Sequence, residues 1–295
     1  LETLKQRGQL TLDVDLTGRE VSPTSANYPE ADFGWMDDQV SKGYQAAITS
    51  LVGERWGRLL LTLQRYPGRT LSAECLQAAV TQVEAVLQVR PRRRVELVQG
   101  RRQELVAQLN HLHDQLAENQ GQQQRRWADL RLIKPEIKQL QAEVSQLAAT
   151  YQANHWTERP HSQLAKRRHA HVQEQLLALD EWLAYLEADN SANPNPVTLV
   201  LRIDAGFSTG PNLTWLIDMG YTVLTKAHHS HSTDRLRRRL SSQPAWIPVG
   251  KNAEAIAMDA YHQNECPYPL QAMLVRYHLP AKIRYTSLLY YGETS

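Results

Sequence analysis

Aspartates in two distant stretches are spaced so that their carboxylates could hold a divalent cation. Asp13 and Asp15 alternate with apolar residues over positions 10 to 17, which places both on the polar face of a predicted strand. Asp204 directly follows the apolar run 197–203, which predicts a strand buried on both faces. If the two strands are neighbours, the carboxylates meet at one sheet edge, and their oxygens suit Mg²⁺ or Mn²⁺. Two such ions could support an in-line phosphoryl transfer, whereas the alternative is that these aspartates only cap turns or helices.

Basic residues that follow Asp204 in the sequence predict contacts with phosphate. Lys226 ends the next predicted strand, and an arginine cluster on a predicted short helix comprises Arg235, Arg237, Arg238 and Arg239. Contacts of this kind with a DNA backbone would add affinity that depends on salt and not on base sequence. Solvated side chains are the competing interpretation.

Histidines and tryptophans near these basic residues have two interpretations each. His228, His229 and His231 could bind phosphate or a transition metal, or could belong to a polar loop. Trp215 and Trp246 could stack on an extruded base, or could be core residues.

The elements that would position Asp15 are predicted to be a meander followed by a helix. Apolar and polar residues alternate over 10–17, and short apolar runs follow at 44–52 and 58–64, which predicts three antiparallel strands. Residues 71–89 carry apolar side chains at helical spacing without Pro or Gly, which predicts an amphipathic helix.

Residues 95–190 change in character and predict long helices. Leu105, Leu109, Leu112 and Leu116 follow heptad spacing, and two similar seams run over 133–151 and 172–186. Breaks are expected around Gly121 and at 154–162, which contains Pro160, so the helices should fold back as a hairpin or small bundle and form a coiled-coil arm.

The Asn- and Pro-rich stretch 189–196 ends this helical region and predicts a domain boundary. A strand, helix and strand unit should follow, with Pro211 in the first helical turn and Gly220 at the helix end. Strand-like runs at 253–260, 270–279 and 283–291 predict a mostly β extension over 228–295. The predicted order is therefore a first half-core (1–94), an inserted helical region (95–190), a second half-core (191–227) and the extension.

Several of these stretches together resemble the DDE transposases of bacterial insertion sequences. The matching segments are Leu-Asp-Val-Asp-Leu-Thr at 12–17, Lys-Gly-Tyr at 42–44, Leu-Arg-Ile-Asp-Ala-Gly-Phe at 201–207, Asn-Leu at 212–213, Gly-Tyr at 220–221 and Thr-Lys at 225–226. The resemblance implies an α/β fold with a ribonuclease H-like mixed sheet. It also implies that Asp15, within the family's Asp-x-Thr motif, is the first catalytic aspartate, with Asp13 as fallback, and that Asp204 is the second.

The same resemblance implies an activity and its partners. Such an enzyme cuts DNA at transposon ends and joins the freed 3′ hydroxyl to target DNA, using Mg²⁺ or Mn²⁺. We expect a homodimer on double-stranded DNA with terminal inverted repeats, in the bacterial cytoplasm and at the nucleoid when bound. The arm would then serve dimerisation or hold DNA.

The family's third acidic ligand, a Glu in a Tyr-x2-Arg-x3-Glu-x6-Lys spacing, has no match in this sequence. Glu254, Glu265 and Glu293 come late enough, but each lies in or beside a strand-like run. We therefore expect the chain to be a fragment whose catalytic helix lies beyond Ser295.

Composition narrows the remaining classes. The chain has 295 residues, 42% hydrophobic and 22% charged, with a net charge of +2, which is typical of a folded protein. Its two cysteines form no zinc or disulfide pattern, and no Gly-x-Ser-x-Gly, P-loop or membrane-span pattern occurs. An inactive remnant that binds DNA or a partner through the arm remains an alternative, as does a purely structural coiled-coil protein.

Overall fold

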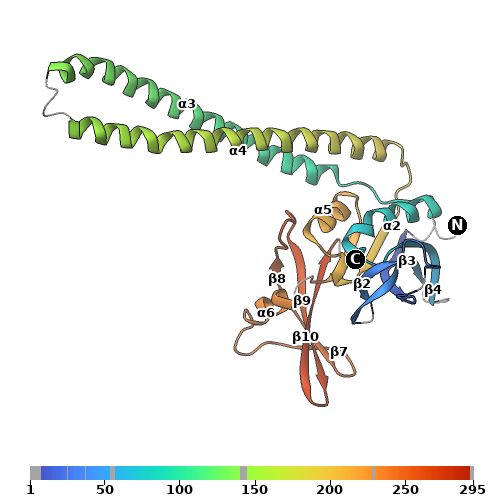
Figure 1. Ribbon diagram of the computed structural model, residues 1–295. Helices are drawn as coiled ribbons and strands as arrows, with labels where there is room; N and C mark the ends of the chain where they lie inside the picture. Colours follow the sequence, from blue (N-terminus) through green and yellow to red (C-terminus); the bar gives the residue numbers. More distant parts are fainter. Residues whose placement is uncertain are drawn as a thin grey trace. The chain divides into compact units, whose positions relative to one another are not determined.

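The chain forms two compact units. The computed structural model describes residues 8–24, 26–36, 38–53, 57–139, 145–227 and 230–292, without the side chains of 130, 132–162 and 230. One unit joins the residues up to 94 with those from 189 onward, and the other comprises 95–188 (Figure 1). The first unit is a mixed α/β structure built on one large mixed sheet, and the second is helical.

One part of the sheet is formed by five strands that come from both halves of the first unit. These strands are β1 (Gln9–Glu20), β3 (Gln39–Gly53), β4 (Gly57–Pro67), β5 (Thr198–Ile203) and β6 (Thr222–Lys226). The strand β3 pairs antiparallel with β1 and with β4, which confirms the predicted meander. On the other side of β1, β5 and then β6 are added in parallel. The strands that carry Asp15 and Asp204 are therefore direct neighbours.

The two faces of this sheet differ sharply in burial. Leu12, Val14 and Leu201 are at most 3% exposed and lie on the face that packs against α2 (Ser72–Leu87) and α5 (Gly210–Asp218). The opposite face carries Asp13, Asp15 and their cross-strand neighbours, which are half-buried or exposed. We call these the helix face and the open face. Alternation along β1 thus separates core-forming residues from polar ones, as period-two patterning requires.

The predicted β extension is part of the same sheet. Its strands are β7 (Ile247–Gly250), β8 (Ala253–Tyr261), β9 (Leu270–Leu279) and β10 (Lys282–Tyr291). The strand β10 pairs antiparallel with β6, and β9, β8 and β7 follow in order, which gives ten strands together with β2 (Asp32–Met36). The short helix α6 (Ser230–Arg237) packs on β10 and β9 (Figure 1). His228 and His229 lie outside the described residues, whereas His231 lies in α6.

The predicted end of α5 is confirmed in detail. Pro211 lies in its first turn, and Gly220, just beyond the last helical turn, has φ +90°. A Cβ at Gly220 would lie 1.9 Å from the carbonyl oxygen of Arg92, so both the backbone angle and the close approach require glycine.

Arg93 joins three parts of the first unit where the chain leaves for the helical unit and returns. Its guanidinium is 1% exposed and donates to both carboxylate oxygens of Glu84 on α2, at 2.8 Å each. It also donates to Asp189 Oδ2 at 2.6 Å and to the carbonyl oxygen of Met219 at 2.8 Å. Burial alone would lower the pKa of Arg93, but the hydrogen bonds and charges of Glu84 and Asp189 outweigh burial and raise it. The buried charge is therefore fully paired.

The departing and returning chain segments are also joined by hydrogen bonds to their backbone groups. The side chain of Asn190 accepts from the amide of Arg93 at 2.7 Å and donates to its carbonyl oxygen at 3.0 Å. The amide of Val197 donates to the carbonyl oxygen of Arg90 at 3.1 Å. These bonds satisfy the backbone of a segment that has no regular secondary structure.

The second unit is formed by two long helices, α3 (Val95–Gln139) and α4 (Ser145–Ser191), and the last three residues of α4 belong to the first unit. Gln99 bonds to Glu187, Arg102 pairs with Asp180, and the rings of His113 and His169 lie 6.4 Å apart. In these three pairs the residue number increases along α3 and decreases along α4. The helices are therefore antiparallel and form a hairpin.

The breaks predicted within this region are wrong. The helix α3 continues through Gly121, and α4 continues through 154–162 including Pro160. A glycine costs a helix only about 1 kcal/mol relative to alanine, which the rest of a 45-residue helix tolerates. Of the predicted seams, Val172, Leu183 and Leu186 are at most 8% exposed, and the seam over 133–151 lies outside the described side chains.

The strand β2 was not predicted, because tertiary packing creates it. Its residue Met36 is 2% exposed and fills a pocket floored by Gly18, Gly43 and Gly68. A Cβ at Gly18 or Gly68 would lie 2.6 Å from an atom of Met36, and one at Gly43 would lie 2.2 Å from the carbonyl oxygen of Arg19. Gln45 donates to the carbonyl oxygen of Trp35 at 3.0 Å and fixes the strand further.

Candidate metal and DNA-binding site

Asp15, Asp204 and Lys226 lie in one row across three adjacent strands. They directly follow three residues that stand side by side in the sheet, namely Val14, Ile203 and Thr225. Neighbours in register project to the same face, so all three polar side chains lie on the open face. Asp204 and Lys226 lie at the carboxyl ends of the two parallel strands, which is the edge where open α/β sheets bind ligands.

The carboxylates in this row are accessible. Asp204 Oδ1 lies 3.4 Å from Lys226 Nζ, and the two side chains are 59% and 57% exposed. Asp15 Oδ1 accepts from the adjacent amide of Leu16 at 2.9 Å, which orients the carboxylate. An ion pair this exposed contributes at most about 1 kcal/mol, so an incoming cation or phosphate can separate it.

Asp13 is engaged differently from Asp15. Arg202 donates to both of its carboxylate oxygens, at 2.5 and 2.7 Å, and Arg58 lies 2.8 Å from Asp13 Oδ2. The hydrogen bonds that Arg202 donates to Asp13 raise the pKa of Arg202, although partial burial opposes the shift. A cation at Asp13 would have to displace two guanidinium groups. Asp15 is therefore more accessible to a cation than Asp13.

A third acidic ligand does not join this pair in the part of the chain that is described. No group of three His, Cys, Asp or Glu side chains suited to a metal occurs among the described residues. Glu254 accepts from Arg276 at 2.6 Å and from His278 at 2.7 Å, and these bonds, the one from Arg276 most, lower the pKa of Glu254. Glu265 lies in a turn with φ +61°, and Glu293 lies outside the described residues.

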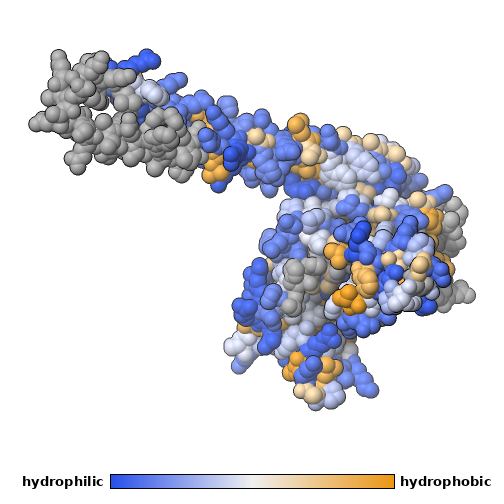
Figure 2. Space-filling model, in the orientation of Figure 1, coloured by the Kyte–Doolittle hydropathy of each residue, from blue (hydrophilic) through white to orange (hydrophobic). Residues whose placement is uncertain are grey.

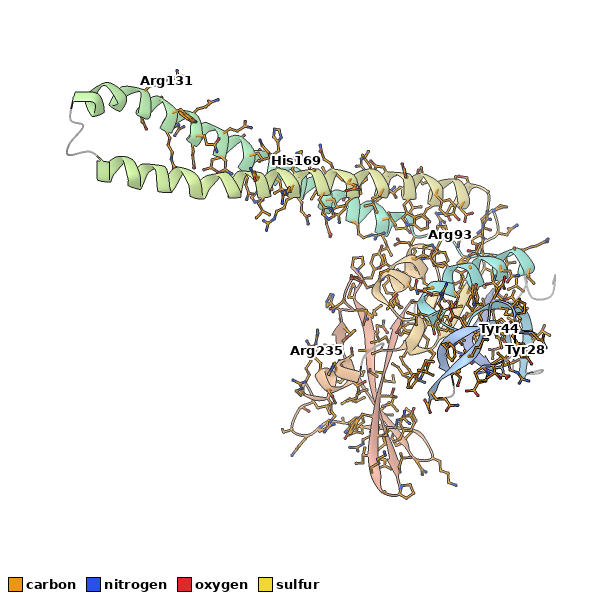
Figure 3. All side chains as sticks on the ribbon, in the orientation of Figure 1. Tyr28, Tyr44, Arg93, Arg131, His169 and Arg235 are labelled. Carbon is orange, nitrogen blue, oxygen red and sulfur yellow. The ribbon has the colours of Figure 1, made fainter. Side chains whose placement is uncertain are left out.

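The structure separates the basic residues that the sequence grouped together. Lys226 lies beside Asp204, whereas the arginines of α6 lie over the helix face of β10. Thr233 on α6 bonds to Ser287 at 2.8 Å, and the guanidinium of Arg237 lies 4.9 Å from the ring centre of Tyr285. Arg235 lies over Tyr261, apart from Tyr44 of the open face (Figure 3). Arg238 and Arg239 are exposed. The carboxylate row and α6 therefore lie on opposite faces of the sheet.

Trp246 belongs to this second surface and not to the carboxylate row. The Arg276 guanidinium lies 4.2 Å from the centre of its ring, and Tyr285 lies 6.3 Å away. Trp215 is half-buried in α5. Neither tryptophan is among the exposed large hydrophobic residues, and neither lies beside the carboxylate row.

Sequence reasoning missed the ion pairs around Asp13. Arg202 precedes Asp204 by two residues and so projects to the same face of β5, and register places it opposite Asp13. Alternation would have put Arg202 on that face, but only the strand register could identify its partner.

No family model matches the sequence, and no curated protein is similar enough to count as a match. Among the described residues, no helix has both the length and the apolar character needed to cross a membrane.

Proposed function

We propose that the first unit is a ribonuclease H-like core of a DDE transposase that cleaves transposon ends and transfers the strand to target DNA. The strand order β4, β3, β1, β5, β6 supports this proposal, with β3 antiparallel and β5 and β6 parallel to the central β1. The helices α2 and α5 precede β5 and β6 in the sequence, as the connections between such strands require. Fold alone does not define an activity, which depends on the residues of the site.

The observation that carries the proposal is the row formed by Asp15 and Asp204. Both carboxylates are exposed on the open face, where their oxygens would hold Mg²⁺ or Mn²⁺. Such ions, when bound, activate an attacking oxygen and stabilise a leaving one. Water and then the 3′ hydroxyl are the nucleophiles in this reaction class, so the chain itself needs no nucleophilic side chain.

Neighbouring cations would position the DNA phosphate. Lys226 is freed when the carboxylate of Asp204 binds a cation, and its ammonium group then lies at the same strand end, within reach of a non-bridging oxygen. Arg202 is held by Asp13 on the open face. Asp13 precedes Asp15 by two positions on β1, and Arg202 precedes Asp204 by two positions in the sequence. We assign the Asp13 carboxylate to orienting Arg202 and not to binding metal.

The helical hairpin of the second unit would serve dimerisation on double-stranded DNA with terminal inverted repeats, or would hold that DNA. This assignment is part of the proposal and agrees with the need to pair two transposon ends. A bacterial cytoplasmic site of action follows from the same proposal.

One observation favours a second function. The described residues supply two acidic ligands and no third. A DNA-binding module that no longer cuts would need only the cationic surfaces and the fold. The experiment below separates the two functions, because only the first requires Asp15.

We predict that the wild-type chain nicks supercoiled plasmid DNA in Mn²⁺ with the two carboxylates it supplies, that Asp15→Asn abolishes this nicking, and that Asp13→Asn retains it within about tenfold. A wild-type chain that binds DNA without nicking it would instead support the second function. The two aspartates lie on the same strand and face, which makes Asp13→Asn a matched control. The loss at Asp15 should reach at least about a hundredfold, because removing a charged ligand weakens both ion binding and charge stabilisation. Equal activity of the two variants would contradict the assignment, and activity lost only in Asp13→Asn would reverse it.

A further inference from the structure

Large apolar side chains project from β2 onto the open face of the sheet. Phe33 is 56% exposed, Trp35 is 67% exposed, and Val40 on the neighbouring β3 is 65% exposed. Register places Phe33 opposite Lys42 and Trp35 opposite Val40, so all four share the face of Asp15. Apolar side chains are visible on the surface over β2 and β3 in Figure 2. A contiguous exposed apolar patch of this kind marks an interaction site.

The exposure of these aromatic rings is built into the fold. The same strand buries Met36 on the helix face, in the pocket of three glycines, and the carbonyl of Trp35 is held by Gln45. Since alternate residues of a strand project to opposite faces, anchoring Met36 forces Trp35 outward. The rings are therefore presented on a fixed strand.

Cationic side chains surround the aromatic pair on the same face. Arg19 and Lys42 lie on this face next to Tyr44 and Phe33 respectively, and the guanidinium of Arg65 lies 4.7 Å from the centre of the Tyr44 ring. Figure 3 shows Tyr44 and Tyr28 together on this part of the molecule. We call Phe33, Trp35, Tyr44, Arg19, Lys42 and Arg65 the β2 platform.

Most of the acidic residues close to the β2 platform in the sequence do not lie on the open face. Glu20 accepts from Gln39 at 3.0 Å on the helix face, and Asp32 pairs with Arg69 at 3.1 Å there. Glu30 pairs loosely with Arg65 at 3.4 Å, and Asp38 lies at the turn between β2 and β3. The platform therefore combines π faces with a net positive charge, which suits a polyanion better than an apolar protein surface.

We propose that the β2 platform binds unpaired nucleotides of the DNA substrate, with a base stacked on Trp35 and phosphates contacted by Arg19, Lys42 and Arg65. This inference rests on the proposed function and names the form of DNA that the site takes. Aromatic rings with flanking cations are the general means of binding single strands, because every base has a π face. Arg19 follows Asp15 by four residues on the same face of β1, or about 13 Å. A strand that is unpaired at the carboxylate row reaches the platform within a few nucleotides.

The test measures binding of a fluorescein-labelled single-stranded oligothymidine and of a blunt duplex to the full chain, by anisotropy in EDTA. Trp35→Leu should weaken single-strand binding by roughly tenfold to a hundredfold, because it keeps an apolar side chain and loses the π face. Trp35→Phe should retain binding within about threefold of wild type. Binding to the blunt duplex should change little in either variant.

The matched control is Tyr277→Leu, which removes another aromatic ring of the open face, 37% exposed on β9 and outside the platform. It should leave single-strand binding unchanged. The EDTA condition makes the result independent of nicking, so the platform can fail while the proposed function stands. Unchanged single-strand binding in Trp35→Leu would overturn the proposal. So would a loss of self-association in that variant, seen by sedimentation with DNA binding intact, which would identify a second copy of the chain as the occupant.

Discussion

Replacing Arg93 with alanine will destabilise the first unit by about 3 to 5 kcal/mol, or roughly 6 to 20 °C in melting temperature. The guanidinium is 1% exposed, and its removal leaves the carboxylates of Glu84 and Asp189, which are 12% and 13% exposed, without their common partner. The carbonyl of Met219 loses its donor as well. Thermal and urea unfolding, followed by far-ultraviolet circular dichroism, measure the effect.

Arg90→Ala is the matched control for that experiment. Arg90 also pairs with Asp189, at 3.2 Å, but its side chain is 30% exposed and water can replace the lost contact. It should cost about 1 kcal/mol. Equal losses of unfolding free energy in the two variants would show that the Arg93 contacts do not join the chain segments around Arg93 and Asp189 to α2 and α5.

Asp204→Asn will reduce Mn²⁺-dependent nicking of plasmid DNA by at least about a hundredfold while changing the free energy of unfolding by no more than about 1 kcal/mol. The substitution preserves shape and removes one negative charge from a side chain that is 59% exposed. Its charged partner, Lys226, is itself 57% exposed, so stability depends little on the pair. Gel assays of plasmid conversion and a urea titration on the same preparations measure both quantities.

Lys226→Gln separates the role of the ammonium group from that of the carboxylate. It should weaken DNA binding uniformly across sequences and reduce the salt slope of binding by about 1, while metal binding persists.

If Asp204→Asn nicked DNA like the wild type, Asp204 would be only the cap of the short turn that follows β5.

The strands around the candidate site could be predicted because the local spacing of apolar and polar residues is enough to identify them. Alternation over 10–17 defines which face of β1 is buried. The apolar run 197–203 correctly predicted a strand, but the prediction that both of its faces are buried is wrong, because Val200 and Arg202 are only half-buried on the open face. These patterns located Asp15 and Asp204 at strand positions. The parallel pairing of β1 with β5 brings the two positions together. The sequence alone did not establish this long-range pairing, so the prediction that the carboxylates meet was conditional on it.

Features that depend on tertiary partners were missed or wrong. The strand β2 exists because Met36 fills space left by glycines from three other segments, a packing relation without local periodicity. The predicted breaks in the helical unit treated Gly121 and Pro160 as local signals, but both lie within continuous helices. The ion pair between Arg202 and Asp13 required the register of two strands separated by 189 positions.

The Mn²⁺ affinity of the full chain, measured by electron paramagnetic resonance of the free ion, tests the carboxylate row most directly. The wild type and Asp13→Asn should bind Mn²⁺ at a saturable site. Asp15→Asn and Asp204→Asn should each lose more than about tenfold in affinity, because each removes a charged oxygen ligand. Wild-type affinity in both Asp15→Asn and Asp204→Asn would contradict the account.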